Sequence, residues 1–291
     1  MTKADKYLIK LLCDIKTHGF KDENPRPHWP DGTPAYTLSV NHQVREYDIS
    51  KGEVPICTLR PIAWKSAIKE IFWIYQDADN RLDTLRNKYG IQYWNEWESK
   101  DMPGTIGARY GEVVRRYDLM NKLLDGLKNN PYGRRHIIDL YQYKELEETD
   151  GLSPCAFLTI WNVRNQDGIT YLDLSLIQRS GDSIAASCSG VNETQYTALL
   201  MMVARHCGYL PGKLVHYVAN EQVYDRHIVQ AEELIARAEQ RRDEEKTNGE
   251  KPEPKLVLNP DKTDFYSFTI DDFTLENYNP IKPQLKFEIA I

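Results

Sequence analysis

Residues Asp150–Trp161 read DGLSPCAFLTIW. In this stretch Cys155 follows a proline and precedes an apolar run that predicts a strand, so a loop should deliver the thiol to the mouth of a buried sheet. A single unpaired cysteine is usually a small buried hydrophobic residue. The stretch alone therefore leaves two interpretations open, a core thiol and a nucleophile, and the rest of the chain has to decide between them.

Composition limits the class of protein. The chain has 291 residues, of which 41% are hydrophobic and 27% charged, as in ordinary globular proteins. A net charge of −6 without a basic stripe argues against a nucleic-acid-binding protein. Five scattered cysteines without Cys-x-x-Cys spacing indicate reduced thiols and argue against zinc. Because there is no membrane-length apolar run and no apolar signal at the start, we expect a soluble, cytoplasmic protein.

Apolar periodicity predicts helices and strands in mixed order, which indicates an α+β fold. Since no repeat is present and no linker precedes position 236, we expect a single domain spanning residues 1–291. The predicted helices are Lys3–Gly19, a helix starting near Trp64, Leu119–Leu127 and the largely apolar Glu193–His206. The predicted strands are a pair within Tyr36–Tyr47, Tyr171–Ile177, Val215–Val218 and a final apolar strand that ends at Ile291. The charged stretch Glu232–Lys255 predicts a solvated helix end and a long exposed loop.

Several polar residues stand where chemistry is possible. Glu70 falls at the edge of the apolar face of its helix, and a partly buried carboxylate has a raised pKa and can transfer protons near neutral pH. Arg26, between two prolines in a loop, is either a solvated arginine or a phosphate ligand on a flap. Arg134 and Arg135 are likewise either surface residues or phosphate ligands, since guanidinium groups suit a phosphomonoester.

Aromatic residues and glycines suggest a site for a flat ring system. Trp94 and Trp97 lie in the stretch Tyr93–Trp97, and the turn Gly107–Gly111 follows. Glycines permit tight turns and close approach of the backbone, while indole rings suit stacking. A role in the core is equally natural for Trp97.

The order of these motifs resembles the thymidylate synthase family. The resemblance covers nearly the whole chain, and its short-loop form resembles the enzymes of some low-GC Gram-positive bacteria and their phages. It rests on motifs in a fixed order: Glu70 in IKEIFW, Tyr93–Trp97, Gly107–Gly111, Arg134-Arg135, LSPC ending at Cys155, QRS-x-D from Gln178 to Asp182, Asn192, Tyr224 and the terminal Ile289–Ile291.

The resemblance implies a fold and a reaction. The fold is a mixed six-stranded sheet with flanking helices, and the sheet mediates a homodimer. The reaction is the methylation of dUMP to dTMP, with 5,10-methylenetetrahydrofolate as donor of both carbon and hydride and without a metal. Cys155 is expected to attack C6 of uracil, with Arg179 lowering its pKa, and Glu70 is expected to order the water that removes a proton from C5.

The same resemblance implies the binding residues. The nucleotide is expected to contact Gln178, Arg179, Ser180, Asp182, Asn192 and Tyr224, with Arg26 gripping the phosphate and Arg134 and Arg135 reaching the partner's phosphate site. The folate is expected to contact Trp94, Trp97, Asp182 and Ala290. The amide of Asn192 matches O4 and N3–H of uracil.

Two departures from the family pattern concern the nucleotide pocket. Gln222 stands where histidine is usual, and Ser183–Val191 is about two residues longer than the usual segment. Two alternatives stay open at this point. One is a dUMP or dCMP hydroxymethylase of the same fold, in which water captures the methylene. The other is an inactive RNA-binding homologue, which the acidic charge and the complete set of chemical residues disfavour.

Overall fold

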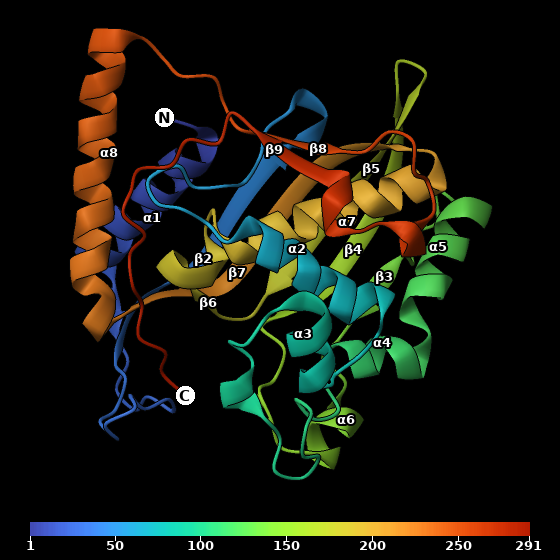
Figure 1. The fold of residues 1–291 in the computed structure, drawn as a ribbon, viewed down its shortest axis with the longest axis horizontal. Helices are drawn as coiled ribbons and strands as arrows, with labels where there is room; N and C mark the ends of the chain where they lie inside the picture. The colour runs from blue at the N-terminus through green and yellow to red at the C-terminus, as the bar shows by residue number, and fades with distance from the viewer.

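The computed structural model describes residues Met1–Ile291. Eight α-helices and nine β-strands alternate irregularly along the chain, as Figure 1 shows. The helices are α1 (Lys3–His18), α2 (Trp64–Ile71), α3 (Leu82–Tyr89), α4 (Gly111–Tyr117), α5 (Leu119–Asn129), α6 (Tyr143–Glu148), α7 (Val191–Cys207) and α8 (Ile228–Asn248). The strands are β1 (Phe20–Lys21), β2 (Thr37–Asp48), β3 (Ile137–Asp139), β4 (Ala156–Gln166), β5 (Ile169–Gln178), β6 (Gly181–Asp182), β7 (Leu210–Tyr224), β8 (Lys255–Leu258) and β9 (Phe273–Glu276).

One mixed sheet organises the molecule. Its strand order is β1-β2-β7-β5-β4-β3, and the two-residue β6 pairs with β7 outside this path. These are the six expected strands, with β6 as a short seventh. β5 and β6 run parallel to β7, whereas the other neighbours are antiparallel. The expected α+β class with a mixed sheet is confirmed.

Helix α7 is the centre of the core. It packs on β5 and β7, and α2 packs on α7, so that Figure 1 shows both helices in front of the sheet. Of the ten residues 193–202 of this helix, all but Met201 are buried, and Ala198, Leu199 and Leu200 are fully inaccessible to solvent. A helix buried on most of its circumference needs apolar side chains all round, which is what the sequence predicted.

The first helix and the hairpin between β4 and β5 follow local rules. Thr2 and Asp5 form a capping box at the start of α1, which ends before Gly19 as expected. Asp167 and Gly168 join β4 to β5 with φ angles of 55° and 79°, the two left-handed positions that a two-residue hairpin turn requires. This short turn fixes the register of the two strands as far as Leu158 and Ile177, and an irregularity between Ala156 and Leu158 then shifts it by one residue.

Three predictions about elements were wrong. Tyr36–Tyr47 holds one long strand, β2, because the left-handed backbone of His42 (φ 58°) interrupts the ladder at one residue without changing the register of its pairing to β7. The chain does not end in a strand, since β9 is the last one and residues 277–291 are irregular.

The third error concerns the charged stretch 232–255. Helix α8 continues to Asn248 and leaves only a short loop before β8. Part of its charged surface is buried: the guanidinium group of Arg237 donates to the carbonyl oxygens of Leu59 and Pro283, both at 3.0 Å, and Arg241 is 5% exposed. The density of charged residues therefore predicted too much solvent exposure for this stretch. Backbone carbonyl groups of distant segments accept hydrogen bonds from its buried arginine side chains.

Candidate active site

Strand register brings Cys155 and Arg179 together. Cys155 directly precedes β4 and Arg179 directly follows β5, and the antiparallel pairing of Ala156 with Gln178 places them side by side. The backbone N–H of Arg179 donates to the carbonyl of Cys155 at 2.9 Å. Nη2 of Arg179 also lies 3.5 Å from Sγ of Cys155. The cysteine is half-buried and unpaired, so a cation and a thiol share one edge of the sheet.

The loop before β4 holds Arg179 in place. The guanidinium group donates to the carbonyl of Pro154 at 2.9 Å through Nε and to that of Ser153 at 2.8 Å through Nη2. Burial raises the pKa of the Cys155 thiol, while the positive charges of Arg179 and Arg26 oppose that rise. The charge of Arg179 thus acts in the expected direction, but burial outweighs it.

Tyr110 is a neighbour of Cys155 that the sequence analysis did not assign to the site. The N–H of Cys155 donates to the Tyr110 hydroxyl at 3.3 Å. Tyr110 has a φ of 46°, which non-glycine residues rarely adopt. Gly107 and Gly111 flank it, and a Cβ at Gly111 would lie 2.1 Å from the carbonyl oxygen of Asp79. The glycine-bracketed turn therefore serves close packing, as expected, and aims this tyrosine at the cysteine.

Glu70 lies on α2, which packs against α7, and is 7% exposed. The hydroxyl of Tyr93 donates to its Oε2. Burial raises the pKa of Glu70, while the hydrogen bond from Tyr93 lowers it. A dry carboxylate with a raised pKa is suited to taking up and releasing a proton near neutral pH.

Trp94 and Trp97 form an aromatic cluster with Tyr110. The ring centroids of Trp94 lie 5.6 Å from Trp97 and 5.3 Å from Tyr110, both in edge-to-face geometry. Trp94 is buried and its Nε1 has no hydrogen-bond partner, whereas Trp97 is half-buried. These are residues that could face a flat heterocycle with a polar edge.

The end of β7 brings further predicted residues to this edge of the sheet. Asp182 in β6 pairs with Gln222 of β7, two residues before Tyr224. Burial raises the pKa of Asp182 and raises that of Tyr224 to about 12, and the negative charge of Asp182 adds to the second shift. Asp182 also accepts hydrogen bonds from the N–H groups of Ile184 and Ala185, at 3.2 and 3.0 Å, and so caps the helical turn Ser183–Ser187.

The segment Ser183–Val191, which we expect to be about two residues longer than is usual, is ordered by buried polar groups. Ser183 and Ser187 donate to Oε2 of Glu221 at 2.9 and 2.6 Å. Cys188 is 2% exposed, and burial raises the pKa of its thiol. Cys188 is therefore a core residue. Asn192 stands at the start of α7, where its amide contacts Gln178 and Gln195.

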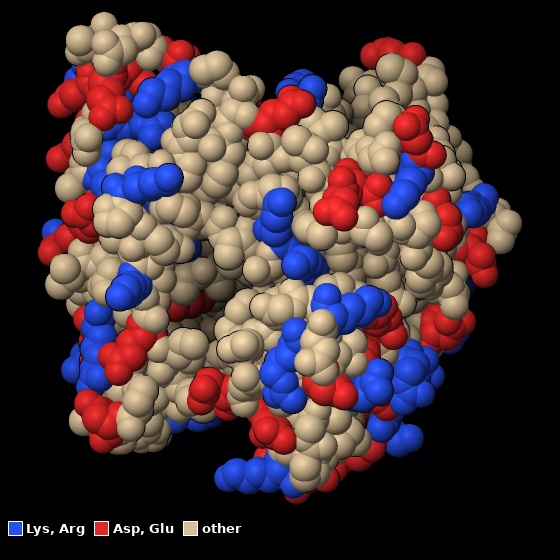
Figure 2. Space-filling model, in the orientation of Figure 1, with Lys and Arg blue, Asp and Glu red and all other residues tan.

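The C-terminal segment closes against the loop that carries Arg26. Ile291 and His28 exchange backbone hydrogen bonds of 2.9 and 2.7 Å, and Arg226 bridges Asp31 of that loop and Glu288 of the C-terminal segment. Figure 2 shows a deep hollow on the face turned to the viewer. It lies to the right of the segment that runs to the C-terminus, in the region where Figure 1 labels β6. The half-buried Ala290 belongs to this closing segment.

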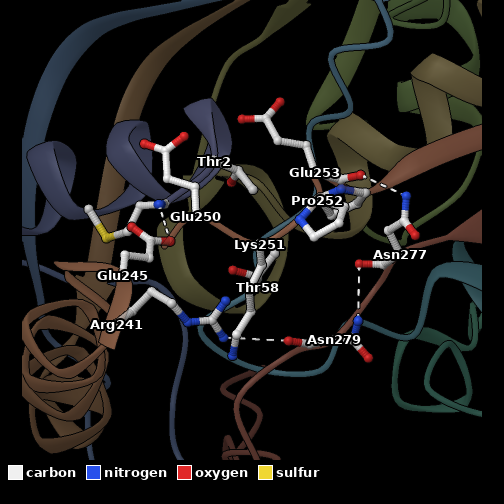
Figure 3. Close-up of a pocket in the computed structure, with 12 residues that line it drawn as sticks. Thr2, Thr58, Arg241, Glu245, Glu250, Lys251, Pro252, Glu253, Asn277 and Asn279 are labelled. Carbon is white, nitrogen blue, oxygen red and sulfur yellow. Dashed lines mark hydrogen bonds and ion pairs between the residues drawn. The ribbon is translucent and has the colours of Figure 1, made fainter. Parts of the chain in front are cut away.

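Two predicted residues are not brought to this site by their own chain. Arg134 and Arg135 are exposed between α5 and β3, and neither forms an ion pair or hydrogen bond with another candidate residue. No cluster of three metal-ligating side chains is present, and no helix is long and apolar enough to cross a membrane. A separate hollow lies where the start of α1, the end of α8 and residues 250–254 meet (Figure 3), and no candidate residue lines it.

Comparison with known proteins assigns the family. A profile described as thymidylate synthase matches residues 6–291. The chain belongs to the thymidylate synthase family. It is 49% identical over 292 residues to the thymidylate synthase of Streptococcus pneumoniae strain 70585, and 48% identical to that of Streptococcus sanguinis, with all of each chain covered. The thermostable thymidylate synthase A of Bacillus subtilis has the same fold, with a TM-score of 0.84, 35% identity and 99% of each chain covered.

Family membership settles the reaction class. Thymidylate synthases are methyltransferases that convert dUMP to dTMP with methylenetetrahydrofolate as co-substrate. The predicted family, fold and reaction are therefore confirmed, and the hydroxymethylase alternative is not favoured. Tyr93, Tyr110 and Gln195 are neighbours of the site that the sequence analysis missed, because only the folded chain shows which tyrosines and amides point at Cys155 and Glu70.

Proposed function

We propose that this chain makes dTMP with Cys155 as nucleophile, Arg179 as its cation and Glu70 as the proton acceptor. The observation that carries the proposal is the placement of a thiol and a guanidinium group on paired strands, near a buried carboxylate of raised pKa. The Cys155 thiolate adds to C6 of uracil, and the C5–C6 π electrons move onto C5 and O4. C5 then acts as the carbon nucleophile. Glu70, through an ordered water, later removes the C5 proton before the thiolate leaves.

The nucleotide occupies the edge formed by the ends of β5, β6 and β7. Arg179 and Arg26 bind its phosphate, and their joint effect on the Cys155 pKa supports their lying on the same side of the site. Tyr224 binds the sugar hydroxyl. Gln178 and Ser180 line the base, and Asn192 matches its O4 and N3–H.

The folate lies above the nucleotide. When bound, methylenetetrahydrofolate supplies the one-carbon unit and then the hydride, and leaves as dihydrofolate. Trp94 and Trp97 offer aromatic edges and faces, and Asp182 offers an acceptor to its pterin. The tail with Ala290 excludes water by holding the C-terminus against the loop around His28.

A homodimer completes the phosphate site with Arg134 and Arg135 of the partner. The face of the sheet opposite α7 supports this, because it carries alternate apolar residues, including Ile160, Ile177 and Val215, of which none is fully buried. Val44 and Ile137 are 57% and 47% exposed. Such a face favours burial against a second copy. The whole of residues 1–291 is the catalytic domain, and its five unpaired cysteines support a cytoplasmic location.

The decisive assay is product analysis. Protein given dUMP and methylenetetrahydrofolate should yield dTMP and dihydrofolate in equal amounts, and hydroxymethyl-dUMP with tetrahydrofolate would instead establish the hydroxymethylase. Cys155→Ser should bind dUMP but lose most turnover. Retained turnover would place the nucleophile elsewhere.

Mixing two inactive variants tests the shared site. In a heterodimer of Cys155→Ser and Arg135→Ala chains, one site is complete. It combines the intact Cys155 of the Arg135→Ala chain with the intact Arg135 of the Cys155→Ser chain. Random exchange should therefore restore about a quarter of the sites, since half of the dimers are mixed and each has one complete site. No recovery would place Arg135 in the site of its own chain, and an active Arg135→Ala homodimer would place it outside any site.

A further inference from the structure

Four charged or titratable side chains form a buried cluster behind the nucleotide edge. We call Arg45, Glu193, His216 and Glu221 the buried cluster; Arg45 is 3% exposed and the others are inaccessible. Arg45 pairs with Glu193 at 2.5 Å and with Glu221 at 2.7 Å, and its Nη2 lies 3.1 Å from Nδ1 of His216. Burying charges costs free energy even when they are paired. All four are shielded from solvent, so any function in the site has to act through a neighbour.

His216 connects the buried cluster to the pocket. Its Nε2 lies 3.0 Å from Oε1 of Gln178, while Nε2 of Gln178 lies 2.9 Å from the carbonyl of Ser180 and 3.3 Å from Oδ1 of Asn192. A carbonyl oxygen only accepts, so the nitrogen of Gln178 has to face Ser180 and its oxygen has to face His216. His216 therefore carries a proton on Nε2.

The other ring nitrogen of His216 faces a donor and an acceptor. Nδ1 lies 3.1 Å from Nη2 of Arg45 and 3.0 Å from Oε1 of Glu193. A neutral ring with its proton on Nε2 accepts from Arg45 at Nδ1, whereas a protonated ring donates to Glu193 there, and both forms keep the proton on Nε2. The hydrogen bond from His216 to Gln178 therefore has its direction from a group that cannot donate, the carbonyl of Ser180.

The amide of Asn192 is oriented at the end of this series. Its Oδ1 accepts from Gln178, and its Nδ2 donates to Oε1 of Gln195 at 3.0 Å. One N–H and one lone pair remain for a ligand, in a fixed order. Uracil, with an acceptor at O4 and a donor at N3, matches that order. Cytosine presents a donor and then an acceptor, which matches only the reversed amide.

We propose that His216, held by Arg45, is a positioning residue that locks the amide of Asn192 through Gln178 and so sets the preference for uracil over cytosine nucleotides. This inference rests on the proposed contact between Asn192 and the base. According to this proposal, a buried side chain that does not contact the base contributes to base selectivity, together with the residues that line the pocket.

The test measures the dissociation constants of dUMP and dCMP by calorimetry. His216→Phe keeps a planar ring but removes both nitrogens, and we expect the ratio of the dCMP constant to the dUMP constant to fall about tenfold, the factor that one hydrogen bond supplies. His216→Gln, whose amide can donate to Gln178, should restore most of the ratio. Tyr47→Phe removes the hydroxyl that lies 3.1 Å from Glu193 in the same buried region, and it should leave the ratio unchanged.

Two further variants separate the possible failures. Asn192→Asp has no amide to orient, so adding His216→Phe to it should not change the ratio. If Asn192→Asp alone leaves the ratio intact, the proposed base contact is wrong. If it changes the ratio but His216→Phe does not, only the positioning role is overturned. Should His216→Phe fail to fold, Gln178→Leu decides, because an unchanged ratio in that variant also overturns the positioning role.

Discussion

Replacing Arg179 by glutamine should leave Cys155 in place but remove the cation beside it. Nη2 of Arg179 lies 3.5 Å from Sγ, and its other bonds go to carbonyl oxygens of Ser153 and Pro154, which the glutamine amide can still reach in part. Arg179→Lys is the matched control, because it keeps a positive charge while losing the fork of donors.

The magnitude follows from the distance between the charges. Two unit charges 3.5 Å apart interact by about 1 kcal/mol at the dielectric constant of water and by about 5 kcal/mol at an effective value of 20. The charge of a guanidinium group is spread over three nitrogens and the site is half-open, so we expect about 1.4–2.8 kcal/mol. That free energy corresponds to a thiolate population about 10- to 100-fold smaller at a pH below the pKa of the thiol.

The assay is the rate of alkylation of Cys155 by iodoacetamide as a function of pH, without nucleotide, since only the thiolate reacts. Burial already raises the pKa of Cys155, so the rate should climb toward alkaline pH in the native protein and should climb at still higher pH in Arg179→Gln. Arg179→Lys should lie between them. A pH profile of Arg179→Gln that coincides with that of the native protein would refute an electrostatic role for Arg179.

Three other expectations concern the proton acceptor, the buried cluster and the tail. Burial raises the pKa of Glu70 and the Tyr93 hydroxyl opposes that rise, so Tyr93→Phe should move the acid limb of the kcat profile to higher pH; an unmoved limb would contradict this. Arg45→Met leaves Glu193 and Glu221 unpaired in the core and should lower the free energy of unfolding in urea by about 3–5 kcal/mol. Deletion of Ile291 removes two backbone hydrogen bonds to His28 and should raise the KM for methylenetetrahydrofolate while leaving the dissociation constant of dUMP in binary complexes unchanged; a change confined to dUMP would contradict a role in folate closure.

The sequence predicted those parts of the fold that depend on local pattern. The buried helix Glu193–His206, the opening helix and the strand after Cys155 follow from apolar spacing, and each is present. The strand Val215–Val218 was predicted too short because β7 continues to Tyr224 through Glu221, a buried acid that interrupts the apolar pattern. Its partners, Arg45 and two serines, come from distant segments and cannot be found by periodicity.

In the candidate site, too, the residues can be predicted from local sequence patterns, whereas contacts between distant segments cannot. Cys155 and Arg179 could be named from their motifs, but their contact depends on a two-residue turn that sets the register of β4 and β5 and on a shift of that register by one residue between Ala156 and Leu158. The resemblance to the family supplied their roles. Tyr110 could not be predicted from the sequence, because the orientation of its side chain toward Cys155 depends on an unusual, positive φ angle.

The register of β4 and β5 also determines where this chain can change length. Side chains alternate along a strand, so one residue inserted between Leu158 and Gln166, where β4 pairs regularly with β5, would turn Cys155 to the opposite face. Residues added at the Asp167–Gly168 turn would leave the pairing intact. The segment Ser183–Val191 lies beyond the paired stretch and begins with a helical turn, so a change of length there would also leave the pairing intact. Insertion scanning should therefore find activity abolished within the hairpin strands and retained at its tip.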